Sequence, residues 1–442
     1  MNGAAPGRVE AMGAAEALDL VGSLDLVGSL EQVGSLDAVG SLNPVGSVDP
    51  VGSLDPVGPV DVVAPTPVVL MLPGQGSQYS GMAHGLYGTE AVFTRVVDEV
   101  LGLLGAEGRR IRDDWLAERP LVEIDDVTRA QPLLFALDVA YGTLLASWGV
   151  RPVALVGHSA GEYAAAVLAG IMNLPDAVAA LETRVRALAG APRGGMVAVG
   201  ASPALLRPWL TSQVVIGAVN APAQVMIAGP EPQLSAVTDA LDAGALTWMR
   251  ARATTGFHSP SVESACASTR SAYERIAYRA PRTVVVSGYT TRPLAEPQLS
   301  DPGFWAMQPA RTVLFGPALS HLLDADGPVG GGPVLLVEAG PGQGLSMLAR
   351  RHPAVKRNGS AVVPLSPMRA GAQLDSEQLA VAAGKLRDRG HRLGHRAPAA
   401  ADPALAPSAA ATASTPSTPS TPSTPSKRER EDQRWTATAG AA

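Results

Sequence analysis

The spacing of apolar residues divides the middle of the chain into short buried strands and amphipathic helices. A fully apolar run at 68–72 predicts one strand, and a second run at 153–156 predicts another. Apolar residues recur with helical spacing in four further segments, which predicts helices at 90–104, 131–148, 161–172 and 175–189. Strands that are apolar throughout are typical of a parallel sheet with helices on its faces.

The pattern changes between residues 196 and 252. Short strands are predicted at 196–199, 214–220, 225–228 and 246–252, with helices at 203–210 and 231–241. This βαββαβ order is that of a ferredoxin-like unit. Strands return at 283–287 and 334–337. The sequence therefore predicts an α/β fold, in which a large subdomain with a parallel sheet carries an inserted ferredoxin-like small subdomain.

The two ends of the chain differ in composition from this body. A Val-Gly-Ser-Leu-Asp repeat recurs every six residues from Val21, and it buries too little apolar surface to offset its ordering entropy. We expect a disordered low-complexity tail at 1–64, in preference to a docking segment. A disordered Ala/Pro/Ser/Thr tail is expected at 393–442. The large subdomain then comprises 65–194 and 255–392, with a linker helix at its end, and the small subdomain comprises 195–254.

Composition excludes several classes of function. Hydrophobic residues make up 46% of the 442 residues, enough for a substantial core. The net charge of -6 gives no basic excess for nucleic acid or an anionic membrane. The chain has no apolar run of membrane-spanning length and no signal peptide, so we expect a cytoplasmic protein. The single cysteine, Cys266, excludes an intrachain disulfide and is typical of a small buried residue.

A candidate nucleophile lies between the second strand and the helix that follows it. The run Gly157-His158-Ser159-Ala160-Gly161 has small residues two positions on either side of the serine, as a tight strand–turn–helix requires. The serine would stand at a helix N-terminus, where free N–H groups can stabilise an oxyanion. A Gly-Ser turn without chemistry is the alternative, and the strand–helix context disfavours it. His158 would point away from Ser159 and is expected to be a packing or rim residue.

A general base must come from elsewhere in the chain. Among seven histidines, His258 stands out because it follows a predicted strand, and a loop at that place can hold an imidazole against the serine. Spacing alone leaves this assignment open. Arg184 lies in the helix at 175–189, and its planar guanidinium suits a carboxylate. A solvated helix arginine, like Arg186 beside it, is the interpretation that the residues alone favour.

Several motifs, which together cover most of the span from residue 68 to residue 369, occur in one order. They are Leu72-Pro73-Gly74-Gln75-Gly76-Ser77-Gln78 with Gly81-Met82, Thr128-Arg129-Ala130-Gln131-Pro132, Gly157-His158-Ser159-Ala160-Gly161-Glu162, Arg184 with Gly194-Gly195-Met196, Asn220-Ala221-Pro222, Ala228-Gly229, Phe257-His258-Ser259 and Glu338-Ala339-Gly340-Pro341-Gly342. This set resembles malonyl-CoA:acyl carrier protein transacylases and the acyltransferase domains of polyketide synthases. Each motif alone is common, whereas the set is specific.

The resemblance implies a fold and a set of roles. The large subdomain would be α/β-hydrolase-like. Ser159 would attack the thioester of an acyl-CoA, and His258 would take its proton and later activate the incoming thiol. The remaining implied roles are an oxyanion hole from the backbone N–H groups of Gln75 and Ala160, a carboxylate anchor at Arg184, a backbone carbonyl at Gln308 that orients the base, and substrate contacts at Asn220, His158 and Phe257.

The resemblance also implies substrates and partners. Phe257 beside the base would crowd an α-methyl group and so favours malonyl-CoA, although the Thr255-Gly256 pair could open room for an unusual extender unit. Neither a cofactor nor a metal is expected, because the acceptor phosphopantetheine is carried by the partner. Nothing upstream resembles a ketosynthase, so we expect a free-standing, monomeric enzyme that serves the carrier protein of a separate synthase. A fragment of a synthase module is the alternative.

Three other functions share some of these features. An α/β-hydrolase would place an acid between serine and histidine in the chain and would lack the Gly-Gln-Gly-Ser-Gln segment. An acyl hydrolase built on the acyltransferase fold, which clears carrier proteins, tends to lose the arginine that is present here as Arg184. A non-catalytic docking protein would not need the Ser159 and His258 pair.

Overall fold

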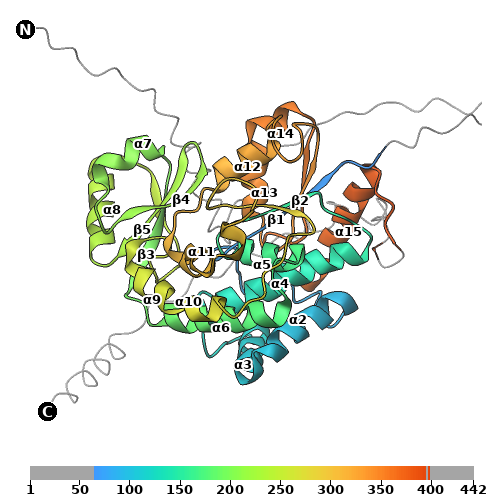
Figure 1. Ribbon diagram of the computed structural model, residues 1–442, viewed down its shortest axis with the longest axis horizontal. Helices are drawn as coiled ribbons and strands as arrows, with labels where there is room; N and C mark the ends of the chain where they lie inside the picture. The colour runs from blue at the N-terminus through green and yellow to red at the C-terminus, as the bar shows by residue number, and fades with distance from the viewer. Residues whose placement is uncertain (1–63, 395–396, 399–442) are drawn as a thin grey trace, which may run out of the picture. The chain divides into compact units, whose positions relative to one another are not determined.

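The computed structural model describes residues 64–394 and 397–398 (Figure 1). The two predicted tails, 1–64 and 393–442, lie almost entirely outside the described residues. The expectations about the six-residue repeat and about the Ala/Pro/Ser/Thr segment therefore stay predictions.

A five-stranded parallel sheet forms the centre of the large subdomain. Its strands, in spatial order, are β7 (Val284–Val286), β2 (Ala154–Gly157), β1 (Val68–Leu72), β8 (Leu335–Glu338) and β9 (Ala361–Pro364). All residues of β1, β2 and β8 are buried, because helices cover both faces of the sheet. The apolar runs at 68–72 and 153–156 thus form the adjacent central strands that the sequence predicts.

Alternate residues of β1 enter two different hydrophobic cores. Val68, Leu70 and Leu72 join one core, while Val69 and Met71 join the other, as the two-residue period of a strand requires. The first core is covered mainly by α2 (Ala91–Leu103), α4 (Val127–Ser147), α5 (Ala160–Ala169) and α6 (Leu174–Ala189). The second core lies under α12 (Phe315–Leu323), α13 (Gly344–Arg351) and α14 (Pro353–Arg357).

The small subdomain is a four-stranded antiparallel sheet. Its strands, in spatial order, are β4 (Val215–Ala221), β5 (Gln224–Pro230), β3 (Gly194–Val199) and β6 (Trp248–Arg250), and its helices are α7 (Pro203–Leu206) and α8 (Gln233–Ala243). When the four strands are numbered as they occur in the chain, their spatial order is 2-3-1-4. This is the ferredoxin-like arrangement, and it confirms the predicted insertion. The N–H of Val219 on β4 donates to the carbonyl of Val313 at 2.7 Å, which links the small subdomain to the large one.

Several elements differ from the sequence prediction. The predicted helix at 131–148 begins earlier, at Val127, because the carboxylate of Asp126 caps it by accepting from the Thr128 N–H at 2.8 Å. The fifth strand, β9, was not predicted, since it has only three apolar residues before it ends at Pro364. The helix α3 (Gly105–Leu116) was also missed, because it contains two glycines and many charges.

The remaining helices complete the large subdomain. They are α9 (Glu263–Ser268), α10 (Arg270–Tyr273), α11 (Pro302–Met307) and α15 (Ala372–Asp388). The last of these occupies the place of the predicted linker helix and packs Leu379 and Leu386 into the first core. No helix of the described part of the chain is long and apolar enough to cross a membrane.

Candidate active site

Ser159 occupies a strained turn between β2 and α5. Its φ of 51° and ψ of -115° lie outside the usual regions for a residue with a side chain. A Cβ on Gly157 would collide with the backbone nitrogen of Glu162, and one on Gly161 would collide with the carbonyl oxygen of Leu72. Both glycines are therefore required by close backbone approach, which is the reason for the spacing recognised in the sequence.

His258 lies directly against the serine. Its Nε2 is 2.8 Å from Oγ of Ser159, and its Nδ1 is 2.7 Å from the carbonyl oxygen of Arg311. In the neutral tautomer that donates from Nδ1 to this carbonyl, Nε2 is free to accept the serine proton. Burial lowers the pKa of His258 to about 4, although the Arg311 carbonyl acts in the opposite direction. The imidazole is therefore neutral at physiological pH and can act as a base.

The carbonyl that orients His258 corrects one sequence assignment. The resemblance placed this role on Gln308, whereas the 2.7 Å contact is made by Arg311, three residues later. Gln308 starts the 3₁₀ turn η5 (Gln308–Ala310), and its carbonyl accepts from the Arg311 N–H while remaining a second backbone neighbour of the His258 ring. The turn brings the carbonyls of Gln308 and Arg311 to the side that faces the His258 ring. The spacing of residues in the sequence does not show which of the two carbonyls accepts from Nδ1.

The Gln308 side chain has a different partner. Its Nε2 donates at 3.1 Å to the carboxyl of Glu162, which is fully buried on the first turn of α5. The same carboxyl accepts from Oγ of Ser287 at 2.9 Å and from the N–H of Gly288 at 2.6 Å. Burial raises the pKa of Glu162 to about 8. Glu162 thus fixes the helix after Ser159 to the loop that follows β7.

Tyr289 is a site residue that the sequence analysis missed. Its ring centroid lies 6.4 Å from that of His258, and its hydroxyl is a hydrogen-bonding neighbour of Ser159. Phe304 packs against the ring edge-on, with the centroids 6.3 Å apart. Burial raises the pKa of Tyr289, so the phenol stays protonated. One tyrosine in a loop between a strand and a distant helix carries no pattern that would have identified it.

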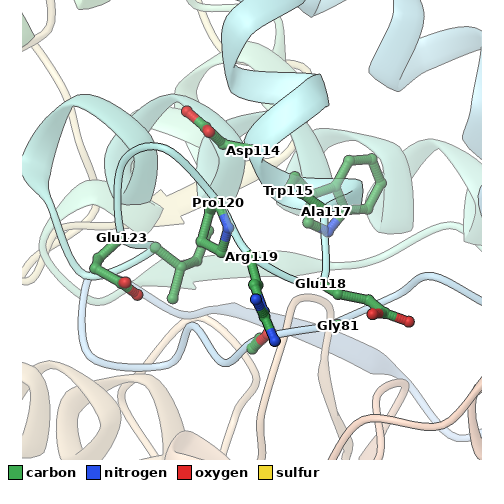
Figure 2. Close-up of a pocket in the computed structure, with 10 residues that line it drawn as sticks. Gly81, Asp114, Trp115, Ala117, Glu118, Arg119, Pro120 and Glu123 are labelled. Carbon is green, nitrogen blue, oxygen red and sulfur yellow. The ribbon is translucent and has the colours of Figure 1, made fainter.

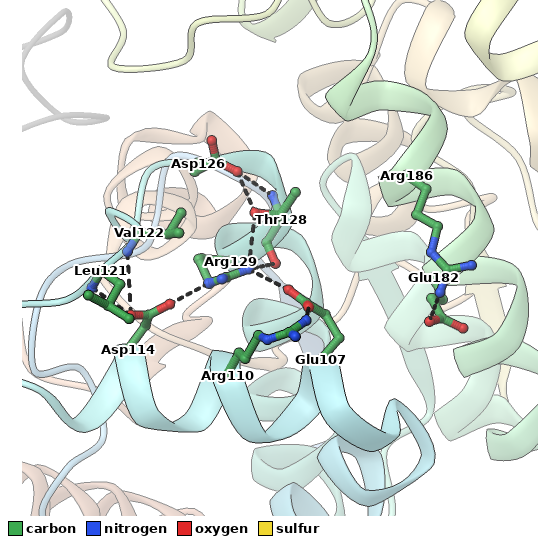
Figure 3. Close-up of polar contacts among 10 residues, drawn as sticks. All are labelled: Glu107, Arg110, Asp114, Leu121, Val122, Asp126, Thr128, Arg129, Glu182 and Arg186. Atoms are coloured by element: carbon green, nitrogen blue, oxygen red, sulfur yellow. Dashed lines mark hydrogen bonds and ion pairs between the residues drawn. The ribbon is translucent and has the colours of Figure 1, made fainter.

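Arg184 is buried, with only 2% of its surface exposed. Its Nε and Nη2 donate to Oε1 of Gln131 at 3.3 and 3.2 Å, and its guanidinium lies 5.4 Å from the ring centroid of Tyr163. Among the described residues, no carboxylate lies within ion-pair distance of it. Arg186, by contrast, is exposed and pairs with Glu182 at 2.5 Å (Figure 3). The interpretation of Arg184 as a solvated helix arginine is therefore wrong.

Gln131 connects Arg184 to the loop that faces the serine. Its Nε2 donates to Oε1 of Gln75 at 3.2 Å, while its own oxygen accepts from Arg184. A Cβ on Gly74 would collide with the carbonyl oxygen of His158 and lie 3.2 Å from Cβ of Ser159, so this loop lies directly against the nucleophile. Within the described chain, the backbone N–H groups of Gln75 and Ala160 have no protein acceptor.

His158 and Asn220 form a contact between the two subdomains. Nε2 of His158 lies 2.9 Å from Oδ1 of Asn220 on β4, and its ring packs on Phe315 with centroids 5.6 Å apart. The pKa of His158 is lowered by burial, so it packs as a neutral ring. Nδ2 of Asn220 is buried without an acceptor among the described residues.

Phe257 packs into a small apolar cluster beside the base. Its ring is buried with Val127, Leu188 and Val262, and Cys266 lies in the same cluster. A Cβ on Gly256 would lie 2.6 Å from the carbonyl oxygen of Gly229, so backbone already occupies the space beside Gly256. Cys266 is buried, and burial raises the pKa of its thiol to about 11.

A separate cavity of about 280 Å³ lies beside the loop between α3 and α4 (Figure 2). It is lined by Ser80, Gly81, Asp114, Trp115, Ala117, Glu118, Arg119, Pro120, Glu123 and Ile124. None of the site residues predicted from the sequence lines it. Within the described ranges, no group of three or more His, Cys, Asp or Glu side chains is placed to hold a metal ion.

Comparison with known proteins identifies relatives of this chain. The chain is 34% identical over 286 residues to a phenolphthiocerol/phthiocerol polyketide synthase from Mycobacterium tuberculosis, covering 64% of this chain and 19% of that protein. It is 34% identical over 283 residues to the polyketide synthase GfsB of Streptomyces halstedii, covering 63% of this chain and 5% of that protein. The chain thus spans a fifth or less of the length of these curated relatives.

Solved structures show the same fold. The acyl transferase domain of SpnD, in complex with 2-(pent-4-yn-1-yl)malonyl, is 30% identical with a TM-score of 0.67, covering 74% of this chain and 78% of that one. The malonyl CoA-acyl carrier protein transacylase of Coxiella burnetii has a TM-score of 0.62 at 21% identity, covering 74% and 99% of the two chains, and shows the fold alone. The acyl transferase domain family matches residues 69–334. The chain therefore belongs to the acyl transferase domain family.

Proposed function

We propose that this protein moves a malonyl-type acyl group from CoA, through an ester on Ser159, to the phosphopantetheine thiol of an acyl carrier protein in polyketide biosynthesis. The observation that carries the proposal is Arg184, a buried cation without a carboxylate partner in the described chain. A buried charge is costly unless it is paired, so the site is suited to a ligand that brings its own carboxylate. The free carboxylate of a malonyl group meets this need.

The first half-reaction acylates the serine. Oγ of Ser159 attacks the thioester carbonyl carbon while its proton passes to Nε2 of His258, which lies 2.8 Å away. The N–H groups of Gln75 and Ala160 stabilise the oxyanion that forms on the carbonyl oxygen. The intermediate then expels the CoA sulfur, which takes the proton from His258, and the acyl group remains on Ser159 as an ester.

The second half-reaction repeats these steps with the carrier protein. The phosphopantetheine thiol gives its proton to His258, and its sulfur attacks the ester carbonyl. The second tetrahedral intermediate expels the serine oxygen, which regains a proton from His258. The order is ping-pong, because CoA leaves before the carrier protein reacts. Delivery to the carrier protein of a separate synthase, as a cytoplasmic monomer, stays a prediction.

Two observations bear on the acyl group. The SpnD domain was solved with 2-(pent-4-yn-1-yl)malonyl, which supports a malonyl-type substrate. Phe257, which precedes His258 in the chain, has a buried ring, and backbone is packed against Gly256; both support malonyl itself over a larger extender unit. An acyl hydrolase on this fold is disfavoured by the buried Arg184.

The proposal is tested by loading the protein with malonyl-CoA and measuring the intact mass. We expect one malonyl adduct, located on Ser159 by peptide mapping, which disappears when an acyl carrier protein with its phosphopantetheine is added. Competition among malonyl-, methylmalonyl- and acetyl-CoA identifies the preferred group. Release of free malonate without a carrier protein would indicate a hydrolase, and the absence of any adduct would refute the proposal.

A further inference from the structure

The loop at 117–126 joins α3 to α4 and is fixed at two points (Figure 3). The carboxylate of Asp114 accepts from the N–H groups of Leu121 at 2.7 Å and Val122 at 3.4 Å, and it also pairs with the buried Arg129 at 2.7 Å. At the end of the loop, Asp126 caps α4. These contacts hold the loop to its own helices.

Asp125 makes a different set of contacts. Its Oδ1 accepts from Nε2 of Gln78 at 2.8 Å, and its backbone carbonyl accepts from Nε2 of Gln75 at 3.4 Å. Its Oδ2 lies 3.6 Å from Nη1 of Arg252, two residues after β6 of the small subdomain. Asp125 thus lies between the segment at 74–78 and the small subdomain.

The segment at 74–78 is closed by its own hydrogen bonds. Oε1 of Gln78 accepts from the N–H of Gly76 at 2.7 Å, and Oγ of Ser77 donates to the carbonyl of Gly74 at 2.8 Å. Gly76 has a φ of 112°, a conformation that glycine adopts readily and that residues with a side chain avoid. The Gln78 amide therefore joins two contacts, one to the backbone next to Gln75 and one to the carboxylate of Asp125.

We propose that Asp125 is a positioning residue for the oxyanion hole, acting through Gln78 on the Gln75–Gly76 peptide, which directly follows the peptide that carries the Gln75 N–H. This proposal rests on the proposed function, which assigns that N–H to the oxyanion. Asp125 itself does not touch the reacting atoms. The ion pair with Arg252 is half-exposed and contributes little alone, so the hydrogen bond to Gln78 carries the effect.

The neighbouring residue Asp126 provides a matched control. Asp125→Ala removes the acceptor for Gln78, Asp125→Asn keeps an acceptor oxygen, and Asp126→Ala removes only the helix cap. Single-turnover acylation of Ser159 by malonyl-CoA is followed by intact mass. Loss of a whole oxyanion donor slows catalysis by about a hundredfold or more, and a misplaced donor is expected to slow it by about tenfold.

We expect Asp125→Ala to lower the maximal acylation rate about tenfold, with the half-saturating malonyl-CoA concentration and the Tm unchanged. Asp125→Asn restores most of the rate. Asp126→Ala lowers the Tm and leaves the rate unchanged. Because Asp125 acts through Gln78, the double variant should lose no more than the single Gln78→Ala, which removes both contacts of that amide.

Three outcomes would overturn the proposal. They are a wild-type rate in Asp125→Ala, a loss of rate that parallels the Tm in both aspartate variants, and additive losses in the double variant. If malonyl-CoA fails to acylate the wild type, the proposed function fails separately. In that case the same variants are compared by the rate at which a fluorophosphonate labels Ser159. This reaction also builds negative charge on an oxygen beside the Gln75 N–H. The same three outcomes would overturn the proposal.

Discussion

Oγ of Ser159 lies 2.8 Å from Nε2 of His258, and both residues have positive φ angles, 51° and 61°. Such angles in residues with side chains cost about 1–3 kcal/mol each and persist only where the surroundings enforce them. For Ser159 the enforcement comes from the tight turn around Gly157 and Gly161. For His258 it comes from its N–H, which donates to the carbonyl of Pro309 at 2.6 Å, and from the contact of Nδ1 with Arg311.

The two members of this pair are expected to fail in different ways. Ser159→Ala removes the acceptor of the acyl group, so no malonyl adduct forms. His258→Ala leaves the serine without a base and is expected to slow acylation about 1,000-fold, the middle of the range for general-base loss. Single-turnover loading measured by intact mass separates the two. His321→Ala, a change at a half-buried residue that contacts Arg292 outside the site, serves as the control and should load normally. Normal loading of His258→Ala would contradict the assignment.

The lowered pKa of His258 predicts an unusual pH profile. With a pKa of about 4, the imidazole is neutral from pH 5.5 to pH 7.5, so kcat/KM for acylation should be nearly flat across that range. A histidine with an ordinary pKa of about 6.5 would retain only about a tenth of its neutral form at pH 5.5. A tenfold fall in kcat/KM between pH 7.5 and pH 5.5, in protein that remains folded by circular dichroism, would contradict the prediction.

The arginine pair on α6 separates carboxylate recognition from surface charge. Arg184→Ala removes the buried guanidinium and is expected to weaken malonyl loading about 30- to 100-fold, the effect of a lost charge-assisted contact of about 2–3 kcal/mol. Loading of acetyl-CoA, which has no free carboxylate, should be spared or improved. Arg186→Ala is the matched control, since Arg186 is exposed and pairs only with Glu182. Equal losses for malonyl- and acetyl-CoA would show that Arg184 has a structural role instead.

Local patterns predicted much of this fold. The apolar runs of β1 and β2 and the small residues around Ser159 are dictated by neighbours in the chain, so the turn and its nucleophile could be identified from the sequence. The ferredoxin-like order was predictable for the same reason, because each of its strands and helices has its own period.

Contacts between distant segments could not be predicted in this way. The choice between Gln308 and Arg311 depends on how the η5 turn meets a ring 50 residues earlier, and spacing does not determine it. Asp125 gains its contacts with Gln75 and Gln78 only when two loops meet across the site. Arg184 shares the buried face of α6 with Leu181 and Leu188, a spacing that indicates burial, whereas its hydrogen-bond partner Gln131 comes from a distant helix and could not be predicted.

The close approach at Gly157 predicts a steric effect. In Gly157→Ala the new Cβ would collide with the backbone nitrogen of Glu162, so the turn must open and move Ser159 away from His258. We expect a lower Tm and loading slowed at least about tenfold, since a misplaced reacting group has that order of effect. Gly190→Ala, where the new Cβ would lie 3.6 Å from the nearest atom, should change neither quantity. Unchanged loading in Gly157→Ala would show that the turn is not under this constraint.

The buried carboxyl of Glu162 predicts how stability depends on pH. Its pKa is about 8 in the folded protein and near the ordinary value of 4.5 in the unfolded chain, because burial disfavours the charged form. Between these values the folded state holds more protons than the unfolded state, so the free energy of unfolding falls as pH rises from about 5 to about 8. Glu162→Gln cannot ionise and should lose this contribution, which is a few kcal/mol at most over that range.

Urea unfolding of the wild type and Glu162→Gln at pH 5 and pH 8 measures this contribution. The variant should gain stability relative to the wild type as pH rises, because only the wild type must keep a carboxyl protonated in its core. The buried Glu338, whose pKa is raised to about 7, contributes equally to both proteins and cancels in the comparison. Parallel pH dependences in the two proteins would mean that Glu162 is ionised in the folded state despite its burial.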